Sequence, residues 1–178
     1  MTKVSRMVVH EGDWYEVSCA VRADGISSPV AEFLEALKER KWTPGADESS
    51  DMVLDEQVKD YQWFVAKLEY FADYGEFPQN GNWNQLMNGI WEIKRGAIRV
   101  SFFDTDGHGN YSPKIVARVH TGGGGYCPLP EFDDYVRLGT VFLKGSGKTP
   151  PSEIDLAEKV REEDLAHDRC EWEQDDLD

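Results

Sequence analysis

The segment Ile90 to Phe103 restricts the possible folds of this chain more than any other part of the sequence. It reads IWEIKRGAIRVSFF, with a short apolar run on either side of Arg95 and Gly96. Two such runs around a glycine turn are typical of a β-hairpin. Alternation places Lys94 and Arg99 on the same side of the hairpin, either as an ordinary solvated sheet face or as part of a cationic site.

Other patterns surround this hairpin with helices and further strands. Residues Trp14 to Arg22 alternate as a strand does, whereas Ser28 and Pro29 are typical of a helix start. The predicted fold is α+β, with an N-terminal strand, a two-helix hairpin, an antiparallel sheet of about three to four further strands and a C-terminal helix. The predicted helices cover 30–37, 58–72 and 152–167, further strands cover 114–120 and 136–143, and 1–12, 43–51, 78–89 and 121–134 are predicted as irregular segments.

Length and composition favour one cytoplasmic domain. A chain of 178 residues is long enough for one domain with a core and short for two. We expect a single domain over 1–167 and an acidic, mobile tail over 168–178. No stretch approaches the roughly eighteen apolar residues of a membrane span, so no membrane association is expected.

Charge is distributed unevenly along the chain. The formal net charge of −15 argues against general affinity for nucleic acids, because phosphate groups repel an acidic surface. Between Lys94 and Lys148, however, eight Lys and Arg residues stand against five Asp and Glu residues. A cationic island therefore lies inside an acidic chain. Its basic members are Lys94, Arg95, Arg99, Lys114, Arg118, Arg137, Lys144 and Lys148.

The segment Val141 to Ala157, VFLKGSGKTPPSEIDLA, joins an apolar strand end, a glycine loop with two lysines and a helix start. The nucleotide-binding loop that it resembles needs a glycine where Phe142 stands. Pro150 and Pro151 also remove backbone donors where such a loop presents amide groups to phosphate. We therefore expect no nucleotide cofactor, and the two lysines need another explanation.

The cysteines favour neither a disulfide framework nor a metal site. Cys19, Cys127 and Cys170 are far apart and odd in number, which is typical of reduced structural thiols. His167 and Cys170 are three residues apart on a predicted helix, but two ligands at that spacing are common by chance. No metal is expected.

Four motifs follow one another in an order that resembles the RelE/ParE superfamily of toxins, and specifically its phage-derived branch similar to HigB. They are SPVAEFLEALKE in the first helix, LEYFADYG at the end of the second, LMNGIWEIKRGAIRVSFF in the hairpin and FLKGSGKTPPSEIDLAEK at the close. The family pattern has a helix with Phe-Leu, an apolar-Trp-Glu-Leu-Arg strand, an arginine on the next strand and a closing Phe-x-Lys-Lys-x-x-Lys-x-Pro. The resemblance covers about Trp14 to His167.

The resemblance implies a toxin of a toxin–antitoxin system or phage that cleaves mRNA on the ribosome and pairs with a small antitoxin protein. In that endoribonuclease reaction the ribose 2′-oxygen attacks the adjacent phosphate, which needs a base, an acid and cations but no metal or other cofactor. By motif, Lys94 takes the place of the strand arginine and Arg99 matches the arginine of the next strand. Lys144 and Lys148 match the closing lysines.

A segment from about Asp104 to Val136 is longer than the corresponding part of the family and adds further candidates. His120 is a candidate for proton transfer, and Tyr126 for stacking on a base. Glu92 and Asp104 are candidates for an acid–base pair, although no spacing rule selects them. The residues expected to bind substrate are Arg95, Arg118, Tyr126 and Arg137.

Two departures from the family pattern leave other functions open. Lys94 does not make the two-pronged phosphate contact of an arginine, and Gly145 stands where a second lysine is common. A second interpretation is therefore a non-catalytic phage or prophage protein of the same fold, whose acidic surface binds and inhibits a basic host protein. A gyrase poison is a third interpretation, because fold alone does not decide the target.

Overall fold

The hairpin predicted at residues 90–103 is present in the computed structural model of the protein, which describes residues 3–43, 54–78, 81–145 and 147–177. Its strands are β4 (Trp91–Arg95) and β5 (Ile98–Thr105), which pair antiparallel with Lys94 opposite Arg99. Gly96 in the turn has a φ of 54°, a left-handed conformation that glycine adopts without steric cost. The β-hairpin predicted from this segment is therefore confirmed.

The hairpin belongs to a six-stranded, mostly antiparallel sheet, which confirms the α+β class. The other strands of this sheet are β1 (Val8–Glu11), β2 (Glu16–Cys19), β3 (Trp83–Gln85) and β8 (Tyr135–Leu143). Their order across the sheet is β1-β2-β8-β5-β4-β3, and only β2 and β8 run parallel. The predicted N-terminal strand and the last strand therefore lie side by side inside the sheet.

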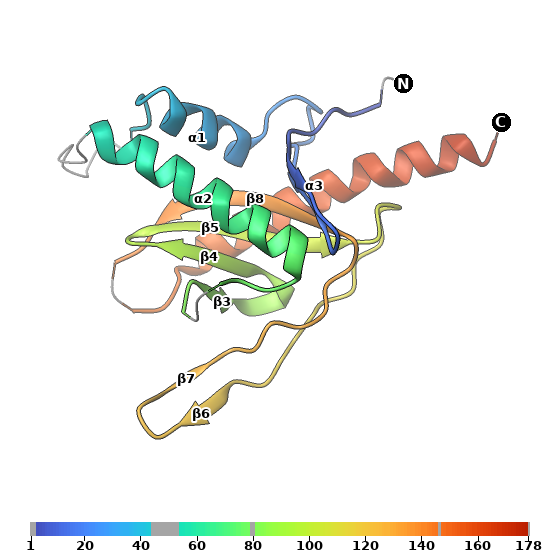
Figure 1. Ribbon diagram of the computed structural model, residues 1–178. Helices are drawn as coiled ribbons and strands as arrows, with labels where there is room; N and C mark the ends of the chain where they lie inside the picture. The colour runs from blue at the N-terminus through green and yellow to red at the C-terminus, as the bar shows by residue number, and fades with distance from the viewer. Residues whose placement is uncertain (1–2, 44–53, 79–80, 146, 178) are drawn as a thin grey trace.

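Helices pack against both faces of the sheet, which gives three layers (Figure 1). The first face is covered by α1 (Pro29–Lys38) and α2 (Leu54–Tyr74), and the larger core lies beneath them. The second face packs against α3 (Pro151–Asp175) over a smaller core. Because strand side chains alternate, Phe102 enters the larger core and its neighbour Phe103 enters the smaller one.

A two-stranded arm extends away from these layers (Figure 1). Its strands are β6 (Val119–Thr121) and β7 (Gly124–Tyr126), which pair with each other and not with the main sheet. We call residues 114–130 the arm. The strand predicted at 114–120 is thus present only at its end, and the glycine-rich segment that was predicted as a loop contributes a turn and β7.

Two segments predicted as irregular form strands. Residues 1–12 include β1, which lies at one edge of the sheet beside β2, and 78–89 include β3 and the short 3-10 helix η1 (Met87–Gly89) at the other side. Both strands are edge strands of three or four residues, too short to show a clear alternation in the sequence. Most of the loop predicted at 43–51 lies outside the described residues.

The C-terminal helix is longer than the sequence indicates. We predicted a helix to His167 followed by a mobile tail, whereas α3 continues to Asp175. Asp168, at the start of the predicted tail, is buried and pairs with two arginines. These ion pairs fix a helical segment that its acidic composition alone does not favour. No helix among the described residues is long and apolar enough to cross a membrane.

Candidate functional site

Three cations lie side by side at one end of the sheet face opposite α1 and α2. Lys94 and Arg99 are paired across β4 and β5, and the intervening neighbours of these residues point into the larger core on the other face. Lys144 follows the last residue of β8, and its backbone N–H donates to the carbonyl of Ala97 at 2.9 Å. We call Lys94, Arg99 and Lys144 the cationic cluster.

The guanidinium of Arg99 is held by the hairpin turn. Its NH1 group donates to the carbonyl of Gly96 at 2.5 Å and to that of Ile98 at 3.0 Å. The Arg99 side chain is only 12% exposed. Because the turn fixes its position, Arg99 presents a preorganised charge to a ligand rather than a mobile one.

A buried carboxylate, Glu92, lies among these cations. It shares a face of β4 with Lys94, two residues away, and its exposed fraction is 0%. The Nε atom of Arg99 is 3.8 Å from Oε1 of Glu92. Neither oxygen of Glu92 makes a hydrogen bond within the described part of the chain. A buried, unsatisfied carboxylate is costly to fold, and such groups occur at functional sites more than elsewhere.

Burial moves the pKa values of Glu92 and Lys94 toward each other. It raises the pKa of Glu92, and the opposing positive charges of Lys144, Arg99 and Lys94 do not cancel this shift. It lowers the pKa of Lys94, which Glu92 opposes and which repulsion from Arg99, Lys144 and Arg118 reinforces. An acid and an amine whose pKa values are shifted in this way are typical of functional sites.

The opposite end of the same sheet face holds charges that neutralise one another. NH1 of Arg137, on β8, lies 2.5 Å from Asp164 and 3.0 Å from Asp168 of α3. Arg6 completes the group, at 2.9 Å from each of the same two carboxylates. We call Arg6, Arg137, Asp164 and Asp168 the paired cluster. The structure places Arg137 in the fold rather than at a substrate site, contrary to the expectation from sequence, because α3 covers it.

Arg95 also lies elsewhere than expected. Its Nε donates to Oδ1 of Asp60 at 2.6 Å, and its guanidinium stands 5.1 Å from the ring centre of Trp63. Both partners belong to α2, on the far side of the sheet from Lys94. Strand alternation separates these consecutive residues, so Arg95 does not join the cationic cluster.

The remaining predicted residues are on the arm and on the segment before α3. Arg118 and Tyr126 line a small pocket together with Lys94, whereas His120, on β6, is exposed and does not line it. Lys148 is exposed between β8 and α3. The other residues of this pocket are Gly81, Trp83, Asn84, Gly125 and Cys127.

The suggested acid–base pair of Glu92 and Asp104 does not form. Asp104 shares its face of β5 with Phe102, which points into the larger core, whereas Glu92 points to the other face. Lys114 Nζ lies 2.9 Å from Oδ2 of Asp104, which also accepts the backbone N–H of Asp133 at 2.7 Å. Asp104 therefore anchors the start of the arm.

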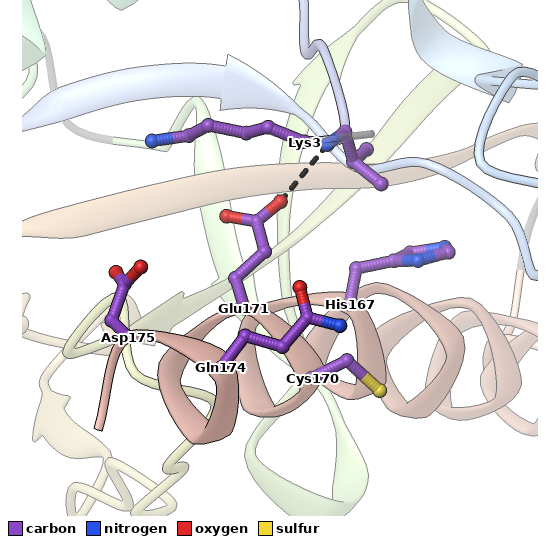
Figure 2. A pocket seen from close by; sticks show the side chains of 7 residues that line it. Lys3, His167, Cys170, Glu171, Gln174 and Asp175 are labelled. Carbon is purple, nitrogen blue, oxygen red and sulfur yellow. Dashed lines mark hydrogen bonds between the residues drawn. The ribbon is translucent and has the colours of Figure 1, made fainter. Parts of the chain in front are cut away.

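A second pocket lies between the N-terminal segment and α3 (Figure 2). His167, Cys170, Glu171 and Gln174 line it from α3. Glu171 points toward Lys3 and accepts the backbone N–H of Val4 at 2.9 Å. His167 is already engaged, because its Nε2 lies 2.7 Å from the carbonyl of Arg22. No group of three or more His, Cys, Asp or Glu residues within the described ranges is arranged to hold a metal ion.

Comparison with known proteins gives no further information on the site. The chain matches no family model, no curated protein and no solved structure. The candidate function therefore depends on the geometry and charges of the chain itself.

The sequence predicted the three residues of the cationic cluster, but it did not predict which residues surround them. Asn84 was missed because its strand was predicted as a loop. Glu92 was considered with the wrong partner, although its position between Trp91 and Ile93 already indicated a carboxylate facing away from the larger core. The signal in the sequence was an acidic residue, Glu92, in the same strand as the basic residues Lys94 and Arg95.

Proposed function

We propose that the protein is a RelE/HigB-like, metal-independent endoribonuclease that acts as a toxin in the cytoplasm, with mRNA on the ribosome as substrate. The single observation that supports this function best is the group of three cations around a buried carboxylate of raised pKa. The order of elements agrees with the family resemblance, since a strand, two helices, the hairpin, the last strand and a helix follow one another as β2, α1, α2, β4, β5, β8 and α3.

In the proposed reaction Lys94 acts as the base. Its lowered pKa increases the fraction of neutral amine, which removes the proton from the ribose 2′-hydroxyl. The 2′-oxygen attacks phosphorus, the bond from phosphorus to the 5′-oxygen breaks, and Lys144 supplies the proton that the leaving oxygen takes up. The products are a 2′,3′-cyclic phosphate and a 5′-hydroxyl end.

Arg99 and Glu92 have supporting roles in this scheme. Arg99 lies beside Lys94 and stabilises the charge that develops on the phosphoryl oxygens. Glu92 has no exposed surface, so it acts as a positioning residue that holds the three cations together and keeps the pKa of Lys94 from falling further. The cationic cluster carries more positive charge than Glu92 neutralises, and this excess is available to the RNA phosphate.

Controlled expression in a bacterial host tests the proposal. Wild-type protein should arrest growth and cut translated messages, leaving 2′,3′-cyclic phosphate ends. Lys144→Ala should relieve both effects, whereas Lys159→Ala, which removes an exposed lysine of α3, should not. If growth and messages are unaffected by wild-type protein that circular dichroism shows to be folded, the nuclease proposal is wrong.

A second candidate function is the non-catalytic inhibitor of a basic host protein, for which the net charge of −15 is the specific support. Affinity capture distinguishes the two candidates. Recovery of ribosomes favours the nuclease, whereas recovery of one basic protein, lost at high salt and unaffected by Lys144→Ala, favours the inhibitor.

A further inference from the structure

The arm is fixed against the edge of the main sheet at its base. The indole Nε1 of Trp83, on β3, donates to the carbonyl of Cys127 at 2.8 Å, and the backbone N–H of Val116 donates to Oε1 of Gln85 at 2.8 Å. The indole of Trp91 donates to the carbonyl of Lys114 at 3.1 Å. These bonds come from both sides of the arm, so its base has a defined position relative to Lys94.

The pocket at this junction opens beside the cationic cluster. Lys94 lines it from β4, Asn84 from β3, and Arg118 and Tyr126 from the arm. Arg118 is near enough to Lys94 for its charge to act on that amine. Arg118 forms no ion pair within the described residues, so its positive charge is available to a ligand in the pocket.

The arm holds Arg118 in place through its own backbone. NH2 of Arg118 donates to the carbonyl of Gly125 at 2.9 Å. A Cβ atom at position 125 would lie 2.8 Å from Nε of Arg118, so the absence of a side chain at Gly125 gives the guanidinium its space. Tyr126, next to this glycine, leaves 44% of its surface exposed and lies across from Val119. A fixed cation and an exposed ring thus border one opening.

We propose that this pocket is a second nucleotide subsite, in which Arg118 binds a phosphate of a single-stranded RNA next to the reacting one and Tyr126 stacks on the adjoining base. Single-stranded nucleic acids are bound through cations along the backbone and aromatic rings on the bases. An acidic peptide satisfies the cations but makes less use of the ring. This proposal rests on the proposed RNA substrate. It also gives the arm a function, because the subsite extends the binding site from the reacting phosphate to a neighbouring nucleotide.

Binding of a fluorescein-labelled 2′-O-methyl RNA hexamer, followed by anisotropy at several salt concentrations, tests the subsite without cleavage, because its 2′-oxygen is blocked. Tyr126→Ala should weaken binding by roughly 5- to 150-fold, the range measured for loss of one stacked base, while Tyr126→Phe should retain it. Tyr74→Ala, at a tyrosine 60% exposed on α2, is the matched control and should bind as wild type.

Arg118→Ala should reduce the slope of log K against log salt concentration by about 0.7, the value for one phosphate of a single strand. Lys41→Ala, at a lysine side chain 74% exposed, should leave the slope unchanged. The indole N–H signal of Trp83 in NMR spectra reports whether each arm variant remains docked, and it should shift when the hexamer binds the wild-type protein.

Equal hexamer affinity in Tyr126→Ala, Arg118→Ala and wild type, with the arm docked, overturns the subsite even if messages are cut in cells. The expected pattern of hexamer binding without any message cleavage supports the subsite while the nuclease proposal fails. A third outcome is that a hexaglutamate peptide binds more tightly than the RNA hexamer, and that Arg118→Ala weakens its binding whereas Tyr126→Ala does not. This outcome assigns the pocket to acidic peptides and also overturns the proposal.

Discussion

The two charge clusters lie on one face of one sheet, yet they differ in almost every physical respect. In the paired cluster, Arg6 and Arg137 each contact both Asp164 and Asp168 within 3.0 Å. In the cationic cluster, three cations surround a single carboxylate whose closest ion-pair contact is 3.8 Å. Buried charges that are matched and hydrogen-bonded offset the cost of their own desolvation, whereas unmatched ones weaken the fold and attract a ligand. The difference teaches that position on the sheet face does not by itself identify a binding residue.

The largest expected effect on stability comes from the paired cluster. Asp164→Ala leaves the buried Arg137 and the largely covered Arg6 with one carboxylate partner instead of two, and loss of one partner of a buried ion pair costs roughly 3–5 kcal/mol. Urea unfolding measures the change in the free energy of unfolding. Glu162→Ala, at a side chain 57% exposed on the same helix, is the control and should cost at most about 1 kcal/mol. A similar small loss in both variants would show that the paired cluster does not hold α3.

The largest expected effect on activity comes from the cationic cluster. Arg99→Ala should lower the rate of message cleavage by roughly 10²- to 10³-fold, as removal of one preorganised charge-stabilising donor does in other enzymes. The free energy of unfolding should fall by less than in Asp164→Ala, because Arg99 bonds to carbonyls of its own turn and its ion-pair contact with Glu92 is long, at 3.8 Å. Primer extension on a reporter message measures the rate. If Arg99→Ala unfolds the protein and leaves the rate per folded molecule intact, the two clusters have the same structural role.

Glu92→Gln should shift the pH dependence of cleavage. Glu92 raises the pKa of Lys94, so its replacement by a neutral amide lowers that pKa. The neutral amine then forms at lower pH, and the rising limb of the pH–rate profile moves toward acid. An unchanged profile would mean that Lys94 is not the base, or that Glu92 does not act through it.

The same variant also tests the folding cost of Glu92. Because its pKa is raised in the folded state, the folded protein keeps this proton where the unfolded chain has lost it, and the contribution of Glu92 to stability falls as pH rises from about 4.5 through the raised value. Glu92→Gln lacks this loss. As pH rises from about 4.5 through the raised pKa of Glu92, the Tm of the variant should therefore increase relative to that of the wild type. A difference in Tm that stays constant across that window would show that Glu92 carries no such cost.

A smaller effect is expected at Arg95, whose pair with Asp60 is partly exposed. The two side chains are 29% and 11% exposed, so Arg95→Ala should lower the free energy of unfolding by about 1 kcal/mol without changing cleavage. Lys94 is the adjacent residue but lies on the other face of the strand, so Lys94→Ala should lower the cleavage rate whereas Arg95→Ala should not. Equal losses of cleavage would contradict this expectation.

The sequence predicted the elements that local patterns specify. The hairpin at Lys94 and Arg99, both early helices and the last strand follow from alternation, helical spacing and capping residues. The partners of each charge depend instead on tertiary packing. Lys94 and Arg137 are both candidate ligands of the substrate in the sequence, whereas in the structure Arg137 is buried under α3 and paired with its carboxylates. The edge strand that supplies Asn84 was missed because three residues give no measurable period.

Lysine footprinting tests the central claim most directly. The protein is treated briefly with an acetylating reagent, alone and bound to ribosomes that carry mRNA, and the modification of each lysine is measured by mass spectrometry. The account predicts several-fold protection of Lys94 and Lys144 and none of the exposed residues Lys41 and Lys159. Protection that omits Lys94 and Lys144, or that is uniform over all lysines, would contradict it.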